Sequence, residues 1–240
     1  MNVSVVLQYA GDCPHRAAAF EWVTARYASE FPEWEQVVGT CEPASPYNRS
    51  AAIIDGARKA SGDVLVVADG DVWVDGLEAA VRFAATSGWS TPHRLIHRLS
   101  RASTDLVLAG NDWHGLPLSE DNSQDNKPYI GNDAGTLLVI QKELLFAVPP
   151  DVRFVGWGQE DVAWGLALRT LHGNTRRTNA DLVHLWHPPQ PRQSRQVGNP
   201  ESLVLVERYR DACRRKTAIA RQAAMREIID EARQYAGISR

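Results

Sequence analysis

Two adjacent carboxylates, Glu160 and Asp161, follow a tryptophan between two glycines in the segment GWGQEDVAWG, residues 156–165. The apolar spacing after them predicts a helix, so the two acids fall in its first turn. Acids in that place complement the helix dipole and cap free N–H groups, which is a sufficient structural reason for both. It does not explain Trp157, a large apolar side chain on a flexible loop. An indole suits the apolar face of a sugar, and the neighbouring carboxylates can accept hydrogen bonds from its hydroxyls.

A second acidic pattern, Asp69-Gly-Asp71, ends the apolar run VLVVADGD. If the chain stays extended, the two side chains point the same way and can share one cation. Carboxylate oxygens are hard ligands that suit Mg²⁺ or Mn²⁺. The structural alternative is a simple turn that the two acids form with Gly70. On this pattern alone, the two interpretations are equally well supported.

Two histidines, His184 and His187, stand three residues apart in DLVHLWHP. On a regular strand they would face opposite sides, but a bend at Trp186 and Pro188 could bring both near one ion. Imidazole beside carboxylates favours Mn²⁺ over Mg²⁺, because imidazole suits transition metals better. The structural alternative is a pair of half-buried or surface histidines.

The elements that must position these residues follow one another as alternating strand and helix patterns. Residues 3–10 predict a strand, residues 13–31 a helix and residues 36–40 a second strand. A loop and a helix that ends at Gly62 come next, followed by one continuous apolar strand over residues 63–76. This alternation predicts an α/β fold with a mostly parallel central sheet, in which ligands bind beyond the carboxyl ends of the strands.

The second half of the chain begins with a polar, turn-rich segment over residues 110–131, which we expect to be a long surface loop. Residues 135–148 predict a strand that passes into a short helix. The helix that starts near Glu160 should end at Gly173, and residues 180–188 predict a strand stopped by prolines. A loop over residues 188–200 follows.

The C-terminal segment, residues 201–240, predicts a long amphipathic helix or a helix pair. We expect it to pack on the preceding domain through four apolar side chains: Leu203, Val206, Ile219 and Ile228.

Composition limits the class of protein. The chain has 240 residues, 44% of them hydrophobic, which suits one domain or one domain with an appendage. The formal net charge of −3 does not favour binding to nucleic acid. No apolar run approaches the roughly 18 to 20 residues that cross a bilayer, and no signal sequence is evident. Three scattered cysteines, Cys13, Cys41 and Cys213, suit a reducing compartment, so we expect a cytoplasmic protein.

Together and in this order, the motifs resemble those of the GT-A glycosyltransferases. The similar branch includes the β-1,4-galactosyltransferases, the bacterial chondroitin polymerases and, more distantly, the polypeptide N-acetylgalactosaminyltransferases. The resemblance covers roughly residues 3–187 and is most specific from YIGNDAG through GWGQED. It implies a Rossmann-like GT-A catalytic domain over residues 1–200, with residues 201–240 as a helical extension packed on it.

The resemblance also implies roles. Asp71 would bind the metal, Asp69 would contact the metal or the nucleotide ribose, and His184 or His187 would complete the site, with His184 ranked first. Trp157 would pack on a sugar, Glu160 would hold acceptor hydroxyls and Asp161 would be the general base. The residues implied to line the nucleotide are Gln8, Tyr9, Ala10, Asn48, Arg49, Asp55 and Gly131.

Two positions depart from the family pattern. The first strand of the family usually ends in an arginine-containing turn, where this chain reads QYAGDCPHR and offers Arg16 as the substitute. The helix that often carries asparagine before glycine has Asp55 before Gly56 here.

The implied reaction is metal-dependent transfer of a sugar, with inversion, from a nucleotide-diphosphate sugar such as a UDP-sugar to an acceptor hydroxyl. Mn²⁺ or Mg²⁺ would be the cofactor. The acceptor could be a saccharide, a protein or another hydroxyl-bearing molecule, and a nucleic-acid acceptor stays open. Residues 110–131 and 188–200 are candidates for acceptor recognition and closure.

Two alternatives remain open from the sequence. A nucleotidyltransferase acting on a sugar phosphate would normally show a glycine-rich, basic phosphate loop, and QYAGDCPHR is poor in that respect. A catalytically inactive carbohydrate-binding module would not need the full set of acids and histidines. The sequence contains no Gly-x-Gly-x-x-Gly or P-loop motif, which disfavours dehydrogenases and P-loop enzymes.

Overall fold

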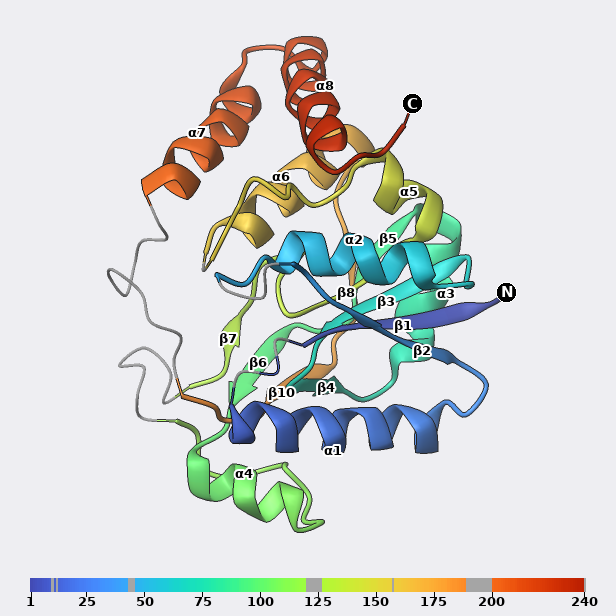
Figure 1. The fold of residues 1–240 in the computed structure, drawn as a ribbon, viewed down its shortest axis with the longest axis vertical. Helices are drawn as coiled ribbons and strands as arrows, with labels where there is room; N and C mark the ends of the chain where they lie inside the picture. Colours follow the sequence, from blue (N-terminus) through green and yellow to red (C-terminus); the bar gives the residue numbers. More distant parts are fainter. Residues whose placement is uncertain are drawn as a thin grey trace.

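The computed structural model describes residues 1–9, 11, 13–42, 46–119, 127–156, 158–188 and 200–239. At its centre lies a six-stranded sheet with helices on both faces (Figure 1). The strand order is β2 (Glu35–Gly39), β1 (Val3–Gln8), β3 (Val64–Asp69), β8 (Leu137–Gln141), β5 (Trp89–Thr91) and β9 (Arg176–Arg177). Only β8 runs against its neighbours, and the pairs β1–β2, β1–β3 and β5–β9 are parallel. The predicted α/β fold with a mostly parallel central sheet is confirmed.

Apolar side chains on both faces of the central strands explain why this sheet is covered twice. In β3, Val64 and Val66 belong to one core cluster, whereas Leu65 and Val67 belong to the other. The first cluster is shared with α1 (Pro14–Glu30), α3 (Leu77–Ser87) and α4 (Arg101–Leu108). The second is shared with α2 (Arg49–Lys59), α5 (Lys142–Ala147) and α6 (Glu160–His172). Figure 1 shows α1 and α2 on opposite sides of the sheet. The elements α3 and α4 lie where the sequence pattern singled out no helix.

The single strand predicted over residues 63–76 is wrong, because the chain turns at Gly70 and Asp71 and enters a second sheet. That sheet has the order β4 (Val72–Val74), β10 (Asp181–His184), β6 (Leu95–Arg98) and β7 (Tyr129–Ile130). The turn leaves no room for a side chain at Gly70, because a Cβ atom there would lie 2.9 Å from the ring of Phe20 and 3.0 Å from the carbonyl oxygen of Gln8. Asp69 and Asp71 therefore do not share one face of one strand.

Helix α2 ends at Lys59, three residues before the end predicted at Gly62. Gly62 instead lies against β1, where its N–H donates to Ser4 Oγ at 2.8 Å. A Cβ atom at Gly62 would come within 2.6 Å of the backbone nitrogen of Ser4, so the glycine serves close packing and not a helix end. Helix α6 ends as predicted at Gly173, which has a φ of 88° and donates to the carbonyl of Arg169.

Part of the predicted surface loop over residues 110–131 packs inward. Trp113 is only 4% exposed and joins the first core cluster, and Leu118 forms an isolated bridge with Leu99. Strand β7 follows at Tyr129. Residues 120–126 of this loop, and residues 189–199 of the second predicted loop, lie outside the described residues.

Two C-terminal helices, α7 (Pro200–Arg214) and α8 (Ala218–Tyr235), pack on α6 at one end of the molecule (Figure 1). Val206 and Ile228 are buried as predicted, and Leu203 is half-buried. The prediction for Ile219 is wrong, because its side chain is 81% exposed. The buried face of α8 is formed by Met225, Ile228, Ile229 and Ala232. At 3.6 residues per turn, Ile219 lies on the other side of the helix. None of the described helices is long and apolar enough to cross a membrane.

Candidate metal and carboxylate site

Asp71, His184 and His187 come together at the junction of the two sheets. Strand β4 runs antiparallel to β10 with Val72 opposite His184, and the N–H of Leu185 donates to the carbonyl of Asp71 at 2.9 Å. This pairing places His184 Nε2 3.8 Å from Asp71 Oδ1 and His187 Nε2 3.3 Å from Asp71 Oδ2. One potential ligand atom from each of the three residues lies within 4.8 Å of the others. The bend expected after β10 thus brings both histidines to the same carboxylate.

The surroundings of these three residues suit a divalent cation. Asp71 is 5% exposed, and among the described residues its Oδ1 atom is buried without a hydrogen-bond partner. Burial, reinforced by the nearby His187, lowers the pKa of His184 well below its usual value. The ring of His184 is therefore neutral at physiological pH, and a neutral imidazole is the form that binds metals. One carboxylate and two imidazoles form a mixed set that suits Mn²⁺.

Asp69 lies outside this group of three. Its Oδ1 accepts a charge-assisted hydrogen bond from Arg49 Nε at 2.8 Å, and both side chains are largely buried. Burial raises the pKa of Asp69, and the charge of Arg49 opposes that rise. The break between β3 and β4 is the reason that the two acids have different partners, with Asp71 facing the histidines and Asp69 facing α2.

Arg49 connects the metal side of the site to the carboxylates of α6. Burial would lower the pKa of its guanidinium, but the charges of Asp69, then of Glu160 and Asp161, raise it overall. Asp69 in turn interacts electrostatically with Asp71 and His184. The ion pair of Asp69 with Arg49 therefore lies between the groups that were predicted separately from the sequence, with Asp71 and His184 acting on Asp69, and Glu160 and Asp161 acting on Arg49.

Glu160 is the carboxylate most affected by its surroundings. Burial, followed by the charge of Asp161, raises its pKa from 4.5 to about 7. Its Oε2 atom is buried, and no described residue donates a hydrogen bond to it. A carboxyl group with a pKa near neutrality can take up or release a proton at working pH.

Asp161 is held by two hydrogen bonds. Its Oδ2 accepts from Asn132 Nδ2 at 2.9 Å, and its Oδ1 accepts from the N–H of Val162 at 2.7 Å. Gly135 approaches closely, since a Cβ atom there would lie 3.0 Å from Asp161 Oδ2. Sequence reasoning missed Asn132, and the only signal for it was its place directly after Gly131 in the motif YIGNDAG.

Two of the residues predicted to line a nucleotide lie at the end of β1. Gln8 is 5% exposed and is paired in register with Asp69, and its Oε1 atom has no hydrogen-bond partner among the described residues. The ring of Tyr9 stacks on Phe20 with 4.4 Å between centroids. Ala10, predicted beside them, lies outside the described residues, as does Trp157.

Asn48, Asp55 and Gly131 make contacts within the protein. Asn48 caps α2 by accepting from the N–H of Ala51, and its Nδ2 donates to the carbonyl of Val152 at 2.7 Å. Asp55 Oδ2 accepts from the N–H of Thr40 and pairs with Lys59 on its own helix. The carbonyl of Gly131 accepts from Arg177 Nη2, and a Cβ atom at Gly131 would lie 2.4 Å from Ile96 Cδ1. These contacts explain the three residue types without a ligand.

Two arginines supply positive charge beside the metal-ligand group. Arg16 Nη1 lies 3.4 Å from Asp71 Oδ2, which places the arginine of the unusual first turn at the site. Arg98, at the end of β6, stacks its guanidinium over the ring of Tyr129 at 4.8 Å. The charges of both contribute to lowering the pKa of His184. Sequence reasoning missed Arg98, because no motif surrounds it.

No protein-family model matches the chain, and no curated protein matches it. Among solved structures, one of a mutant Drosophila β-1,4-galactosyltransferase 7 in complex with manganese, UDP-Gal and xylobiose is 13% identical, with a TM-score of 0.44. That similarity covers 74% of this chain and 65% of the galactosyltransferase, so this chain spans about two thirds of its length. Glucosyl-3-phosphoglycerate synthase from Mycobacterium tuberculosis, in complex with Mn²⁺, UDP-Glc and phosphoglyceric acid, is 14% identical with a TM-score of 0.44. It is covered over 81% of its length by the whole of this chain.

Proposed function

We propose that this protein is a metal-dependent glycosyltransferase, which moves a sugar from a nucleotide-diphosphate sugar to an acceptor hydroxyl. The observation that carries the proposal is the convergence of Asp71, His184 and His187 on one point, two residues along the chain from the ion pair of Asp69 with Arg49. This transfer requires both a cation site and a carboxylate that can take a proton.

Asp71, His184 and His187 would hold the metal, and the two imidazoles favour Mn²⁺ over Mg²⁺. When bound there, the cation would neutralise the diphosphate of the donor and so assist its departure. Arg16 and Arg98 would add two positive charges on the same side of the site. A diphosphate, with its multiple negative charges, is the ligand that best matches this combination of cations.

The nucleoside would lie along the end of β1. Gln8 offers a buried amide oxygen that has no hydrogen-bond partner in the part of the chain that the structure describes, and Asp69 is its register partner on β3. Either can accept a hydrogen bond from a base or a ribose hydroxyl, and we propose uridine as the nucleoside. Tyr9 and Ala10 would complete this wall. Asn48, Asp55 and Gly131 would support it indirectly, because their polar atoms already have partners within the protein.

We propose Asp161 as the general base, held by Asn132 in one orientation. Glu160 would accept a hydrogen bond from another hydroxyl of the acceptor, and Trp157 would pack on a sugar ring. A single displacement in which the acceptor oxygen attacks as Asp161 takes its proton inverts the configuration at the sugar carbon. General-base assistance of this kind contributes roughly 10²- to 10⁴-fold, so positioning of the two substrates must supply much of the remaining acceleration.

We propose residues 1–200 as the catalytic unit and residues 201–240 as an extension of it. The acceptor would be a saccharide, a protein or another molecule that bears a free hydroxyl, and it would enter from the side of Glu160 and Asp161. Residues 110–131 and 188–200 stay candidates for acceptor recognition, although Trp113 packs into the core and residues 120–126 and 189–199 lie outside the described residues.

The test is incubation with a panel of nucleotide sugars and Mn²⁺, with release of nucleoside diphosphate as the measurement. We expect slow, metal-dependent hydrolysis of one donor by the unmodified protein, faster turnover with an acceptor, and loss of both in Asp71→Asn. His172→Ala is the matched control, because His172 is an exposed histidine at the end of α6. Pyrophosphate release from a nucleoside triphosphate and a sugar phosphate would instead identify a nucleotidyltransferase.

A further inference from the structure

We propose that Arg210 of α7 is a positioning residue for the acids of α6, so that the C-terminal helices form part of the active site's support. The inference rests on the proposed function, since it assigns Glu160 and Asp161 to the reaction. It starts from Gln159, the residue immediately before the two acids. Gln159 has a φ of 76°, one of two positive values among the described non-glycine residues, and its side chain makes no capping hydrogen bond to α6. A left-handed backbone at such a residue persists only where its surroundings hold it.

Arg210 is the residue that holds Gln159 in this conformation. Its Nη2 donates to Gln159 Oε1 at 3.1 Å, and its Nη1 pairs with Glu207 one turn earlier on α7. The carbonyl of Gln159 accepts the first hydrogen bond of α6, from the N–H of Ala163 at 3.0 Å. Fixing the side chain of Gln159 therefore fixes the start of the helix on which Glu160 and Asp161 lie.

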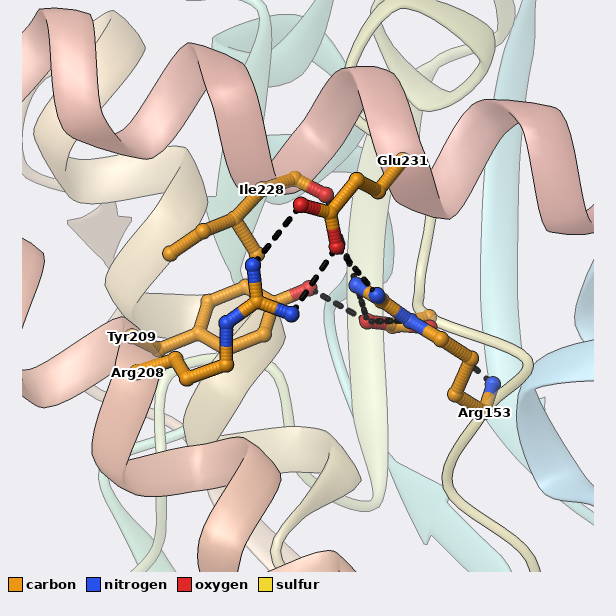
Figure 2. A network of polar contacts seen from close by, with 6 residues as sticks. Arg153, Arg208, Tyr209, Ile228 and Glu231 are labelled. Carbon is orange, nitrogen blue, oxygen red and sulfur yellow. Dashed lines mark hydrogen bonds and ion pairs between the residues drawn. The ribbon is translucent and has the colours of Figure 1, made fainter.

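The same helix also holds the other end of the segment that leads to the acids, through a polar network in which Figure 2 labels Arg153, Arg208, Tyr209 and Glu231. Tyr209, the neighbour of Arg210, donates to Oδ2 of the buried Asp151 at 2.8 Å. Arg153 pairs with Asp151 on one side and with Glu231 of α8 on the other, at 2.7 and 2.6 Å. Glu231 also pairs with Arg208 of α7. Consecutive residues of α7 thus bind the two ends of residues 151–159.

The backbone between Asp151 and Gln159 contains glycines and therefore needs both contacts to hold it in one conformation. Gly156 and Gly158 have φ values of 78° and 105°, in a region that glycine adopts at no steric cost. Glycines also give the backbone many other conformations, and the entropy of fixing them must be offset by contacts. The N–H of Gly156 donates to the carbonyl of Tyr47, and the anchors at Tyr209 and Arg210 complete the restraint. Arg210 acts on the acids through Gln159, so its role is positioning and not catalysis.

The experiment compares Arg210→Met and Arg210→Lys with Arg214→Met in the full chain. Arg214 is the matched control, because it lies one turn further along α7 and pairs with Glu207 and Asp211. Gln159→Gly is a second variant that keeps a left-handed backbone accessible while removing the acceptor of Arg210. The measurements are hydrogen exchange at the Ala163 amide, kcat and KM for sugar transfer, and affinity for UDP with Mn²⁺.

We expect Arg210→Met and Gln159→Gly each to lower kcat by about tenfold or more through misplacement of the acids, with UDP affinity unchanged. The double variant should lose no more than either alone, because both remove the same contact. Exchange at the Ala163 amide should accelerate in Arg210→Met, recover partly in Arg210→Lys and stay unchanged in Arg214→Met.

Unchanged exchange and unchanged kcat in Arg210→Met would overturn the positioning role while leaving the transfer reaction intact. The exchange measurement does not depend on the reaction. If the unmodified protein transfers no sugar, the proposed function fails, and unchanged exchange at Ala163 in Arg210→Met would then overturn the positioning role separately.

Discussion

The side-chain amide of Asn132 donates a hydrogen bond to Oδ2 of Asp161 over 2.9 Å. It joins the turn after β7 to the first turn of α6, two segments that are 29 residues apart in sequence. A carboxylate held in this way keeps one oxygen as an acceptor in a fixed direction. Asn132 would therefore orient the general base that we propose at Asp161.

This relationship predicts different effects for two substitutions. Asp161→Asn should abolish sugar transfer while nucleotide binding stays nearly intact, because the base is lost and the cation site is not. Asn132→Ala should lower kcat by about tenfold, with KM for the donor unchanged, because the base remains but is less well oriented. The control is Asn174→Ala, at an exposed asparagine after α6. Near-normal turnover of Asp161→Asn in steady-state kinetics would remove the base assignment.

Glu160 predicts a pH dependence of stability. Its pKa is raised from 4.5 in the unfolded chain to about 7 in the folded protein, mainly by burial and then by Asp161. The folded state therefore binds this proton more tightly, and the corresponding stability is present below pH 4.5 and is lost as the pH rises to about 7. Glu160→Gln does not titrate, so between pH 4.5 and pH 7 it should gain about 3 kcal/mol in free energy of unfolding relative to the unmodified protein.

Urea unfolding of both proteins at several pH values, with a chelator present, measures this difference. A gap between the two proteins that does not change with pH would show that Glu160 has an ordinary pKa. In the transfer reaction, an ionised Glu160 should be the better acceptor of a hydroxyl hydrogen bond. The rate of sugar transfer should therefore rise with pH toward about 7, and this rise should be absent in Glu160→Gln.

His184 and His187 should contribute together to metal affinity. His184→Ala and His187→Ala should each weaken Mn²⁺ binding by at least roughly 10- to 100-fold, because each removes one of three candidate ligands. Titration calorimetry with Mn²⁺ alone measures the effect, and His172→Ala serves again as the control. If the affinity for Mn²⁺ is unchanged when either histidine is replaced, that histidine is not a metal ligand.

The network around Arg153 predicts a stability effect at Tyr209. Tyr209→Phe removes the hydroxyl that donates to the buried carboxylate of Asp151, and should lower the free energy of unfolding by about 1 to 3 kcal/mol. Tyr235→Phe is the matched control, because Tyr235 is 69% exposed. Equal unfolding midpoints in urea for the two variants would show that the Tyr209 hydroxyl contributes nothing.

Much of the fold could be predicted because its signals are local. Continuous apolar runs such as Val64–Asp69 identify buried strands, and Gly173 marks the end of α6 by a positive φ. The break at Gly70 could not be seen in this way. An apolar run looks the same whether it stays in one sheet or crosses to another, and the close packing of Gly70 on Phe20 and Gln8 is visible only in the tertiary structure.

The candidate site shows the same division. The residue types, a bend at Trp186 and Pro188 and the family resemblance predict that Asp71, His184 and His187 meet, and the structure brings them together. The residues that interact with this site could not be predicted from the sequence. Asn132, Arg98 and Arg210 lie far in sequence from the groups they serve, and arginine and asparagine are common on surfaces, so only the tertiary structure identifies them. The prediction that Ile219 is buried was wrong for a related reason, because the position of a residue around the helix, and not its hydrophobicity, decides whether it is buried.

The most direct test of the account is calorimetric titration of UDP into the protein with and without Mn²⁺, repeated on Asp71→Asn. We expect UDP to bind at least about tenfold more tightly when Mn²⁺ is present, and we expect this gain to vanish in Asp71→Asn. UDP affinity that is independent of Mn²⁺, or a gain from Mn²⁺ that persists in Asp71→Asn, would contradict a shared cation between Asp71, the two histidines and the donor diphosphate.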